Sequence, residues 1–304
     1  MHKSPNKNQH QSNLHQPVLL DEVLDCLAPA KGERYLDLTA GYGGHAAAIL
    51  EYTHGAAVLV DRDENAIREL TSRLPGADIR HDDFYSASQQ LAVEKQHFDM
   101  ILADLGVSSP HLNEATRGFA INQEGPLDMR MDPRQELTAE TVVNTYGEAD
   151  LADILWRYGE EPKARQIARA IVANRPLATT SQLAAIVAKA WPGRSRVHPA
   201  TRTFQALRIA VNDELGLLER SLPIWTSLLA SGGRLAVISF HSLEDGIVKR
   251  FLQERAGDRY DAELRLITKR PVTASPHELV SNPRARSAKL RAAAKINIQK
   301  ERER

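Results

Sequence analysis

The chain has 304 residues, of which 42% are hydrophobic and 26% charged, as in a soluble globular protein with one large domain or two ordinary ones. Its formal net charge is zero, and its single cysteine, Cys26, excludes an intrachain disulfide and a cysteine-based zinc cluster. No apolar stretch approaches the ~18 residues of a membrane span, and the polar N-terminus lacks the apolar centre of a secretory signal, so we expect a cytoplasmic protein without a membrane segment.

Taken in chain order, the sequence alternates strands with helices. Residues 1–13 are polar and predict a disordered tail. The alternation that follows indicates a mostly parallel, doubly wound α/β sheet. Residues 98–105 are a near-continuous apolar run, as in a strand buried on both faces. The expected strands are 34–38, 56–60, 78–81, 98–105 and 234–240, with weaker ones at 264–268 and 289–296, and the expected helices are 18–27, 45–52, 64–74, 202–218 and 243–252.

This rhythm breaks between residues 111 and 201, where no strand is expected. Helical patterns cover residues 148–158, 163–174 and 181–191 instead. We therefore expect an all-helical insert, residues 111–201, inside a discontinuous α/β domain made of residues 14–110 and 202–304.

The first strand runs into a glycine-rich turn, residues 37–45 (DLTAGYGGH), which opens a helix. Glycines permit a positive φ and a close approach of ligand to backbone, and the helix N-terminus offers free N–H groups. Gly41, Gly43 and Ala46 also fit the dinucleotide pattern G-x-G-x-x-A, so a nicotinamide cofactor is one candidate ligand of this turn. A strand–helix connection without a ligand explains the turn equally well.

Acidic residues stand at the ends of successive strands. Asp61 ends the second strand, where a carboxylate can accept both hydroxyls of a ribose. Asp83 and Phe84, after the third strand, could hydrogen-bond an adenine amine and stack on its ring. Asp37, just before the glycines, suits a cationic ligand such as the amino group of methionine and would repel a pyrophosphate. Because such sheets bind ligands at the carboxyl ends of their strands, the acids together favour a ligand site over solvated strand ends.

The fourth strand ends in Asp104 and the turn 105–111 (LGVSSPH). In enzymes that methylate base amines, this edge places an acceptor against a nitrogen whose lone pair is delocalised into the ring. Asp104 could draw on an N–H of the amine and let the nitrogen pyramidalise toward the methyl group, with Ser108 as a further contact. A plain turn and helix start also explains Ser-Ser-Pro.

Several segments between about His15 and Ile296 resemble, in matching order, the MraW/RsmH family of bacterial small-subunit ribosomal RNA (cytosine-N(4))-methyltransferases. The resemblance implies a class I (Rossmann-like) methyltransferase fold, an inserted helical domain and S-adenosylmethionine as donor. It also implies methylation of the exocyclic amine of a cytosine in the decoding region of the small subunit. The matching segments are HQPVLLDEVL, AGYGGH, DRDENAI, DLGVSSPHL, RGFA, GPLDMRMD, YGEE, HPATRTFQALRIAVNDEL, GGRLAVISFHSLEDGIVKRF and NPRARSAKLR.

From the chemistry of the fourth strand's end, Asp104 and Ser108 are the catalytic candidates. Phe240 and His241 are the candidates for stacking on the target base. No catalytic metal is expected, because the histidines lack the H-x-x-x-H spacing of a zinc enzyme. The substrate is expected to be small-subunit ribosomal RNA, within the assembled particle or free, and a homodimer stays open. The implied cofactor contacts are Gly43, Gly44, His45, Asp61, Phe84, Asp104 and His111.

Charge is unevenly distributed along the chain. Residues 1–155 carry 12 Lys/Arg against 25 Asp/Glu, whereas residues 156–208 carry 10 against 2 and residues 265–304 carry 11 against 3. Two basic segments in an otherwise acidic chain favour a polyanionic partner, although solvated helix faces explain them as well. The expected phosphate contacts are Arg194, Arg196, Arg202, Arg284 and Arg286. The tryptophans, expected in the core, are Trp156, Trp191 and Trp225.

Three functions follow from these features. The first is an RNA cytosine methyltransferase, the second a nicotinamide-dependent oxidoreductase, and the third a non-catalytic RNA-binding or assembly factor on the same scaffold. Asp37 ahead of the glycines, and the lack of an obvious hydride-site acid/base set, argue against the second. The intact Asp61, Phe84 and Asp104 argue against the third.

Overall fold

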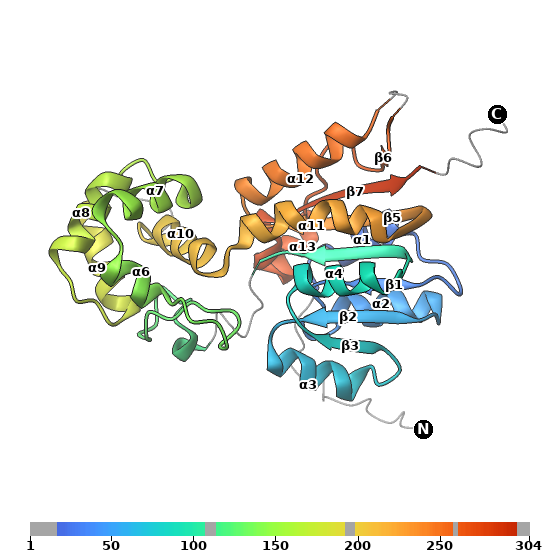
Figure 1. Cartoon of the computed structure of the whole chain (residues 1–304), viewed down its shortest axis with the longest axis horizontal. Coiled ribbons are helices and arrows are strands. Elements are labelled where there is room, and N and C mark those ends of the chain that lie inside the picture. The colour runs from blue at the N-terminus through green and yellow to red at the C-terminus, as the bar shows by residue number, and fades with distance from the viewer. Residues whose placement is uncertain (1–16, 107–113, 192–197, 258–260, 297–304) are drawn as a thin grey trace, which may run out of the picture.

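Seven strands form one sheet in the order β3-β2-β1-β4-β5-β7-β6, seen at the right of Figure 1. This computed structural model describes residues 17–106, 114–191, 198–257 and 261–296. The strands are β1 Tyr35–Asp37, β2 Ala57–Asp61, β3 Asp78–His81, β4 Phe98–Asp104, β5 Leu229–Ser239, β6 Leu264–Leu266 and β7 Lys289–Lys295.

The first five strands in sequence run parallel, and β7 lies antiparallel to both β5 and β6. The expected mostly parallel, doubly wound sheet is therefore confirmed, and its strand order is that of a class I methyltransferase. All seven expected strands are present, and the largest change is that β5 begins at Leu229, five residues before the predicted start.

Helices cover both faces of the sheet, because its central strands are apolar on both sides. In β4, Ile101 and Ala103 pack in one core cluster, while Met100 and Leu102 pack in another. The first cluster is shared with α4 (Phe84–Val93), α11 (Glu214–Leu228) and α12 (Ser242–Arg255). The second is shared with α1 (Leu20–Leu27), α2 (Gly44–Thr53), α3 (Glu64–Arg73), α13 (Pro276–Ser281) and the 3₁₀ turn η2 (Pro283–Ser287).

A separate helical unit lies to one side of the sheet (Figure 1, left). Its helices share one hydrophobic core of their own. Gly159 lets α7 cross α10 closely, because a Cβ at this position would lie 2.6 Å from the carbonyl oxygen of Arg202. The unit consists of η1 (Ala115–Arg117), α6 (Ala139–Thr145), α7 (Glu148–Gly159), α8 (Ala164–Ala173), α9 (Thr180–Ala190) and α10 (Thr201–Asn212).

Helix α10 packs in the helical unit, whereas the sequence analysis placed it in the α/β domain. Its residues Phe204, Leu207 and Val211 belong to the helical core. We therefore propose that the helical unit ends at Asn212 rather than at residue 201.

The single helix expected over residues 202–218 is wrong. The structure has two helices, α10 and α11, separated at Asp213, whose φ of 47° is left-handed. Aspartate tolerates this conformation better than most residues do, and it ends α10 and lets the chain turn back onto the sheet. Since the helical periodicity continues on both sides of the break, the apolar pattern gave no sign of it.

The tryptophans divide between core and surface. Trp225 is fully buried and Trp191 is partly buried against the helical core. The expectation for Trp156 is wrong, because its side chain is 62% exposed on α7. Within the part of the chain that the structure describes, no helix is both long and apolar enough to span a membrane.

Candidate active site

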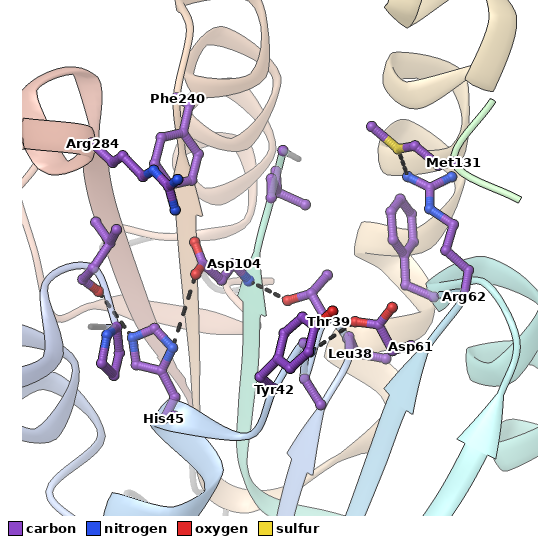
Figure 2. A pocket seen from close by; sticks show the side chains of 18 of the residues that line it. Leu38, Thr39, Tyr42, His45, Asp61, Arg62, Asp104, Met131, Phe240 and Arg284 are labelled. Atoms are coloured by element: carbon purple, nitrogen blue, oxygen red, sulfur yellow. Dashed lines mark hydrogen bonds and ion pairs between the residues drawn. The ribbon is translucent and has the colours of Figure 1, made fainter. Parts of the chain in front are cut away.

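A cavity of about 800 Å³ opens where the carboxyl ends of β1, β2, β4 and β5 meet, on the side that faces the helical unit (Figure 2). Its floor comes from the sheet, through residues such as Thr39, Asp61 and Asp104. Its opposite wall includes Met131 and Arg208 of the helical unit. This is the edge at which the acidic residues of the sequence were expected to converge.

The glycine turn is held in place by Asp61. The backbone N–H of Gly41 donates to Asp61 Oδ2 at 2.8 Å, and that of Asp63 donates to Asp61 Oδ1 at 2.8 Å. Gly41 and Gly43 have φ values of 52° and 78°, which favour glycine at both positions. Asp61 therefore fixes the turn and lines the cavity at the same time.

The predicted cofactor contacts in the turn differ in where they point. Gly44 and His45 line the cavity. Gly43 is not among the lining residues, and a Cβ built on it would lie 2.9 Å from Leu70 of α3, so a contact with a cofactor at this position stays a prediction.

His45 links the turn to the end of β4. Its Nε2 lies 2.9 Å from the carbonyl oxygen of Val18, and its Nδ1 lies 3.9 Å from Asp104 Oδ2. The ring is nearly buried, with 7% of the residue exposed. Figure 2 shows the imidazole of His45 directed toward Asp104.

Asp104 combines an unpaired carboxylate oxygen, among the described residues, with a raised pKa. Its Oδ1 is buried and has no hydrogen-bond partner among the described residues. Burial raises the pKa of this carboxyl well above its usual range, and the nearby carboxylates of Asp37 and Glu244 raise it further. A buried carboxylate without compensation costs free energy, and a cationic ligand in the cavity would supply the missing charge.

Asp37 is buried and does not line the cavity, whereas the interpretation of the sequence placed it against a cationic ligand. It is 1% exposed, is absent from the cavity wall, and accepts hydrogen bonds from the Tyr35 hydroxyl at 2.8 Å and the Thr39 backbone at 3.2 Å. The position before the glycines is correct, but the short strand β1 turns this side chain into the protein interior.

Burial raises the pKa of Asp37 from 3.8 to about 7, so the folded protein retains a proton that the unfolded chain loses near pH 4. This contribution to stability is complete below pH 3.8 and is lost as the pH rises through 7. We expect the free energy of unfolding of the wild type to fall over this window more steeply than that of an Asp37→Asn variant, by up to about 1.4 kcal/mol per pH unit. Urea unfolding between pH 4.5 and 8 measures both slopes; equal slopes would contradict the assignment.

The segment after β3 has a larger structural role than the sequence indicated. Asp83 caps α4, accepting from the backbone N–H groups of Tyr85 at 2.8 Å and Ser86 at 3.0 Å, so much of its carboxylate is committed to the helix. Phe84 lines the cavity, is 8% exposed and contacts Trp225 edge-to-face at 5.6 Å. Both lie at the cavity, and their contacts with an adenine stay predictions.

The stacking candidates separate clearly. Phe240 lines the cavity, close to Gly106. His241 instead caps α12, in a reciprocal arrangement with Glu244, and does not line the cavity. Phe240 is therefore the candidate of the two that can reach a bound base.

Among the expected phosphate contacts, Arg284 lines the cavity beside Phe240 and has no hydrogen-bond or ion-pair partner in the described ranges (Figure 2). Arg286 is exposed, and Arg202 donates to the carbonyl oxygen of Glu160 at 2.8 Å. The other predicted site residues, Ser108, His111, Arg194 and Arg196, lie outside the described residues.

Several cavity residues were not predicted from the sequence, and they include Arg62, Met131, Arg208 and Glu214. Arg208 and Glu214 form a bidentate ion pair, with Nε–Oε1 and Nη2–Oε2 distances of 2.8 Å each. Arg62 stands next to Asp61, and Met131 lies in the segment GPLDMRMD, whose resemblance to a family was recognised without a role for its side chains. Its position next to Asp61, a predicted ligand contact, was the available signal for Arg62.

Comparison with known proteins shows the family of this chain. The profile of the MraW methylase family matches residues 12–296. Proteins named ribosomal RNA small subunit methyltransferase H are similar over most of their length. That of Nitratidesulfovibrio vulgaris strain DP4 is 51% identical over 310 residues, covering 93% of this chain and 95% of the relative. Those of Acidobacterium capsulatum and Heliobacterium mobile are 48% and 47% identical, covering 92% and 93% of this chain and 98% and 99% of the relatives. The chain belongs to the MraW methylase family.

Proposed function

We propose that this protein transfers a methyl group from S-adenosylmethionine to the exocyclic amine of a cytosine in the decoding region of small-subunit ribosomal RNA. The observation that carries the proposal is the buried Oδ1 of Asp104, which has no partner in the described part of the chain and lies in a cavity at the carboxyl edge of a class I methyltransferase sheet. Family membership and the names of the relatives support a ribosomal RNA substrate.

The donor fits the charge of the cavity. S-adenosylmethionine supplies an electrophilic methyl group on a cationic sulfur, together with a positively charged amino group. Asp104 compensates this positive charge, and Asp61, at the end of β2, accepts the ribose hydroxyls. Phe84 contributes an apolar wall for the adenine.

The acceptor enters beside Phe240 and Arg284. Phe240 offers a ring for stacking on a cytosine that has left its own stack. The guanidinium of Arg284, which has no partner within the described ranges, binds a phosphate of the same strand. Asp104 accepts an N–H hydrogen bond from the target amine, which frees the nitrogen lone pair for the methyl carbon. The N-methylated amine is cationic and acidic, so its proton leaves without a dedicated base. Ser108, on the following turn, is a proposed further contact.

The test uses small subunits from cells that lack this protein, incubated with purified enzyme and labelled S-adenosylmethionine. We expect one labelled cytosine, methylated on its exocyclic nitrogen, when the RNA is digested and its nucleotides are mapped. Free ribosomal RNA forms a parallel arm, in which we expect much weaker labelling because the assembled particle presents the base. An Asp104→Asn variant serves as the inactive control.

Each alternative outcome has a distinct meaning. Label on another base, or on a ribose, would overturn the assignment to the cytosine amine. Tight binding of S-adenosylhomocysteine without transfer to particle or RNA would favour the non-catalytic assembly factor.

A further inference from the structure

Arg62 is a cation in the cavity wall whose protein partner is unusually weak. Among the described residues its guanidinium contacts only the sulfur of Met131, and a thioether is a poor acceptor. Arg208, on the same wall, is by contrast paired with Glu214 through two hydrogen bonds. The remaining N–H groups of Arg62 therefore lack protein acceptors in the part of the chain that the structure describes.

No nearby carboxylate among the described residues pairs with the guanidinium of Arg62. Burial lowers the pKa of its guanidinium, while the more distant carboxylates of Glu214, Asp61 and Asp83 raise it. None of these three carboxylates forms an ion pair with Arg62. A desolvated guanidinium with free donors is suited to a planar, acceptor-rich ligand.

Met131 is held firmly over Arg62 by the helical unit. It is 1% exposed, and its backbone N–H donates to Asn212 Oδ1 at 2.8 Å. Arg117 donates to its carbonyl oxygen at 3.0 Å. The thioether is thus fixed relative to α10, and it orients the guanidinium from the side opposite the sheet (Figure 2).

We propose that Arg62 and Met131 form the outer wall of the adenosine site, with the planar guanidinium stacked on the face of the purine ring. This inference rests on the proposed function, which places the adenosine of the donor against Asp61 and Phe84. It makes the helical unit part of the donor site, through Met131, in addition to any contact with RNA.

The test measures dissociation constants by calorimetry for two probes, S-adenosylhomocysteine and 5′-methylthioadenosine, which share the adenosine and differ in the amino-acid half. Arg62→Met is expected to weaken both probes by the same factor, about 30-fold, as for loss of a desolvated cation–π contact. Met131→Ala should weaken both by a smaller factor, and Arg62→Lys, which keeps the charge but loses the plane, should fall between Arg62→Met and the wild type.

Two controls separate this role from a structural one. Arg68→Met removes an exposed guanidinium from α3 that contacts Asn65 and does not line the cavity, so both affinities should stay unchanged. Asp104→Asn should weaken S-adenosylhomocysteine far more than methylthioadenosine, because it acts on the charged half.

The outcomes distinguish this inference from the proposed function. If the Arg62 and Met131 variants lower the unfolding temperature of the free protein but bind both probes within twofold of wild type, the pair is only a contact between the two units and the inference is wrong. If the wild type binds neither probe, the proposed function itself fails.

Discussion

Replacing Asp104 with asparagine is expected to weaken the binding of S-adenosylmethionine by about 30-fold or more at neutral pH. Removing one member of a desolvated charge pair typically costs ~2–5 kcal/mol, and the buried Oδ1 of Asp104 has no hydrogen-bond partner among the described residues. Methyl transfer should fall by at least the same factor when the donor is subsaturating. Equilibrium binding and initial rates measured on the same preparations check both statements.

The pH dependence of binding gives this prediction a second readout. Because burial raises the pKa of Asp104 well above its usual range, the free protein holds a proton there that a cationic ligand must displace. Affinity should therefore increase as the pH rises from 5.5 to 7.5, and binding should release protons into the buffer. Calorimetry in buffers of different ionisation enthalpy measures that release directly.

A matched variant tests whether any lost carboxylate would have the same effect. Asp78 lies at the start of β3, is paired with Arg80 at 3.0 Å and does not line the cavity. Asp78→Asn should leave affinity and proton release at wild-type values. If Asp104→Asn behaves like Asp78→Asn, the carboxylate does not compensate the charge of the donor.

The sheet was predictable because its signals are local. Strand β4 is apolar on both faces, and the glycines after β1 adopt positive φ values. Both features can therefore be recognised from a few consecutive residues. Helix α4 was not predicted, although Asp83 caps it, because the same residues were interpreted as ligand contacts. The break at Asp213 depends on tertiary packing of two helices against different cores, which periodicity cannot reveal.

The sequence correctly placed residues at strand ends beside the cavity. It did not reveal the direction of a side chain, or cavity residues that come from distant parts of the sequence. Asp61 and Asp104 line the cavity as expected, because the ends of parallel strands meet at one edge. Asp37 has the same kind of position but points inward, which depends on the register of a strand only three residues long. Met131 reaches the cavity from a segment about 70 residues beyond Asp61, and no local pattern links the two.

Replacing Arg208 with methionine is expected to destabilise the protein by about 3–5 kcal/mol, because it leaves Glu214 buried without its partner. The side chains of Arg208 and Glu214 are 16% and 8% exposed, and the pair joins the last turns of α10 to the first turn of α11. Arg157 and Asp153, on the surface of α7, provide a matched comparison; their side chains are 66% and 58% exposed. Arg157→Met should change stability by less than about 1 kcal/mol. Urea unfolding of the three proteins measures these differences.

The double variant Arg208→Met, Glu214→Leu tests whether the ion pair itself contributes to the free energy of unfolding. A buried ion pair often contributes little net stability relative to apolar residues of similar volume, so the double variant should recover most of the loss. Recovery should be incomplete, because the carboxylate of Glu214 also stabilises the charge of Arg62. If the double variant is as unstable as the sum of the two single variants, the residues act independently. The join between the helical unit and the sheet would then depend on apolar packing around the break at Asp213, and not on this charge pair.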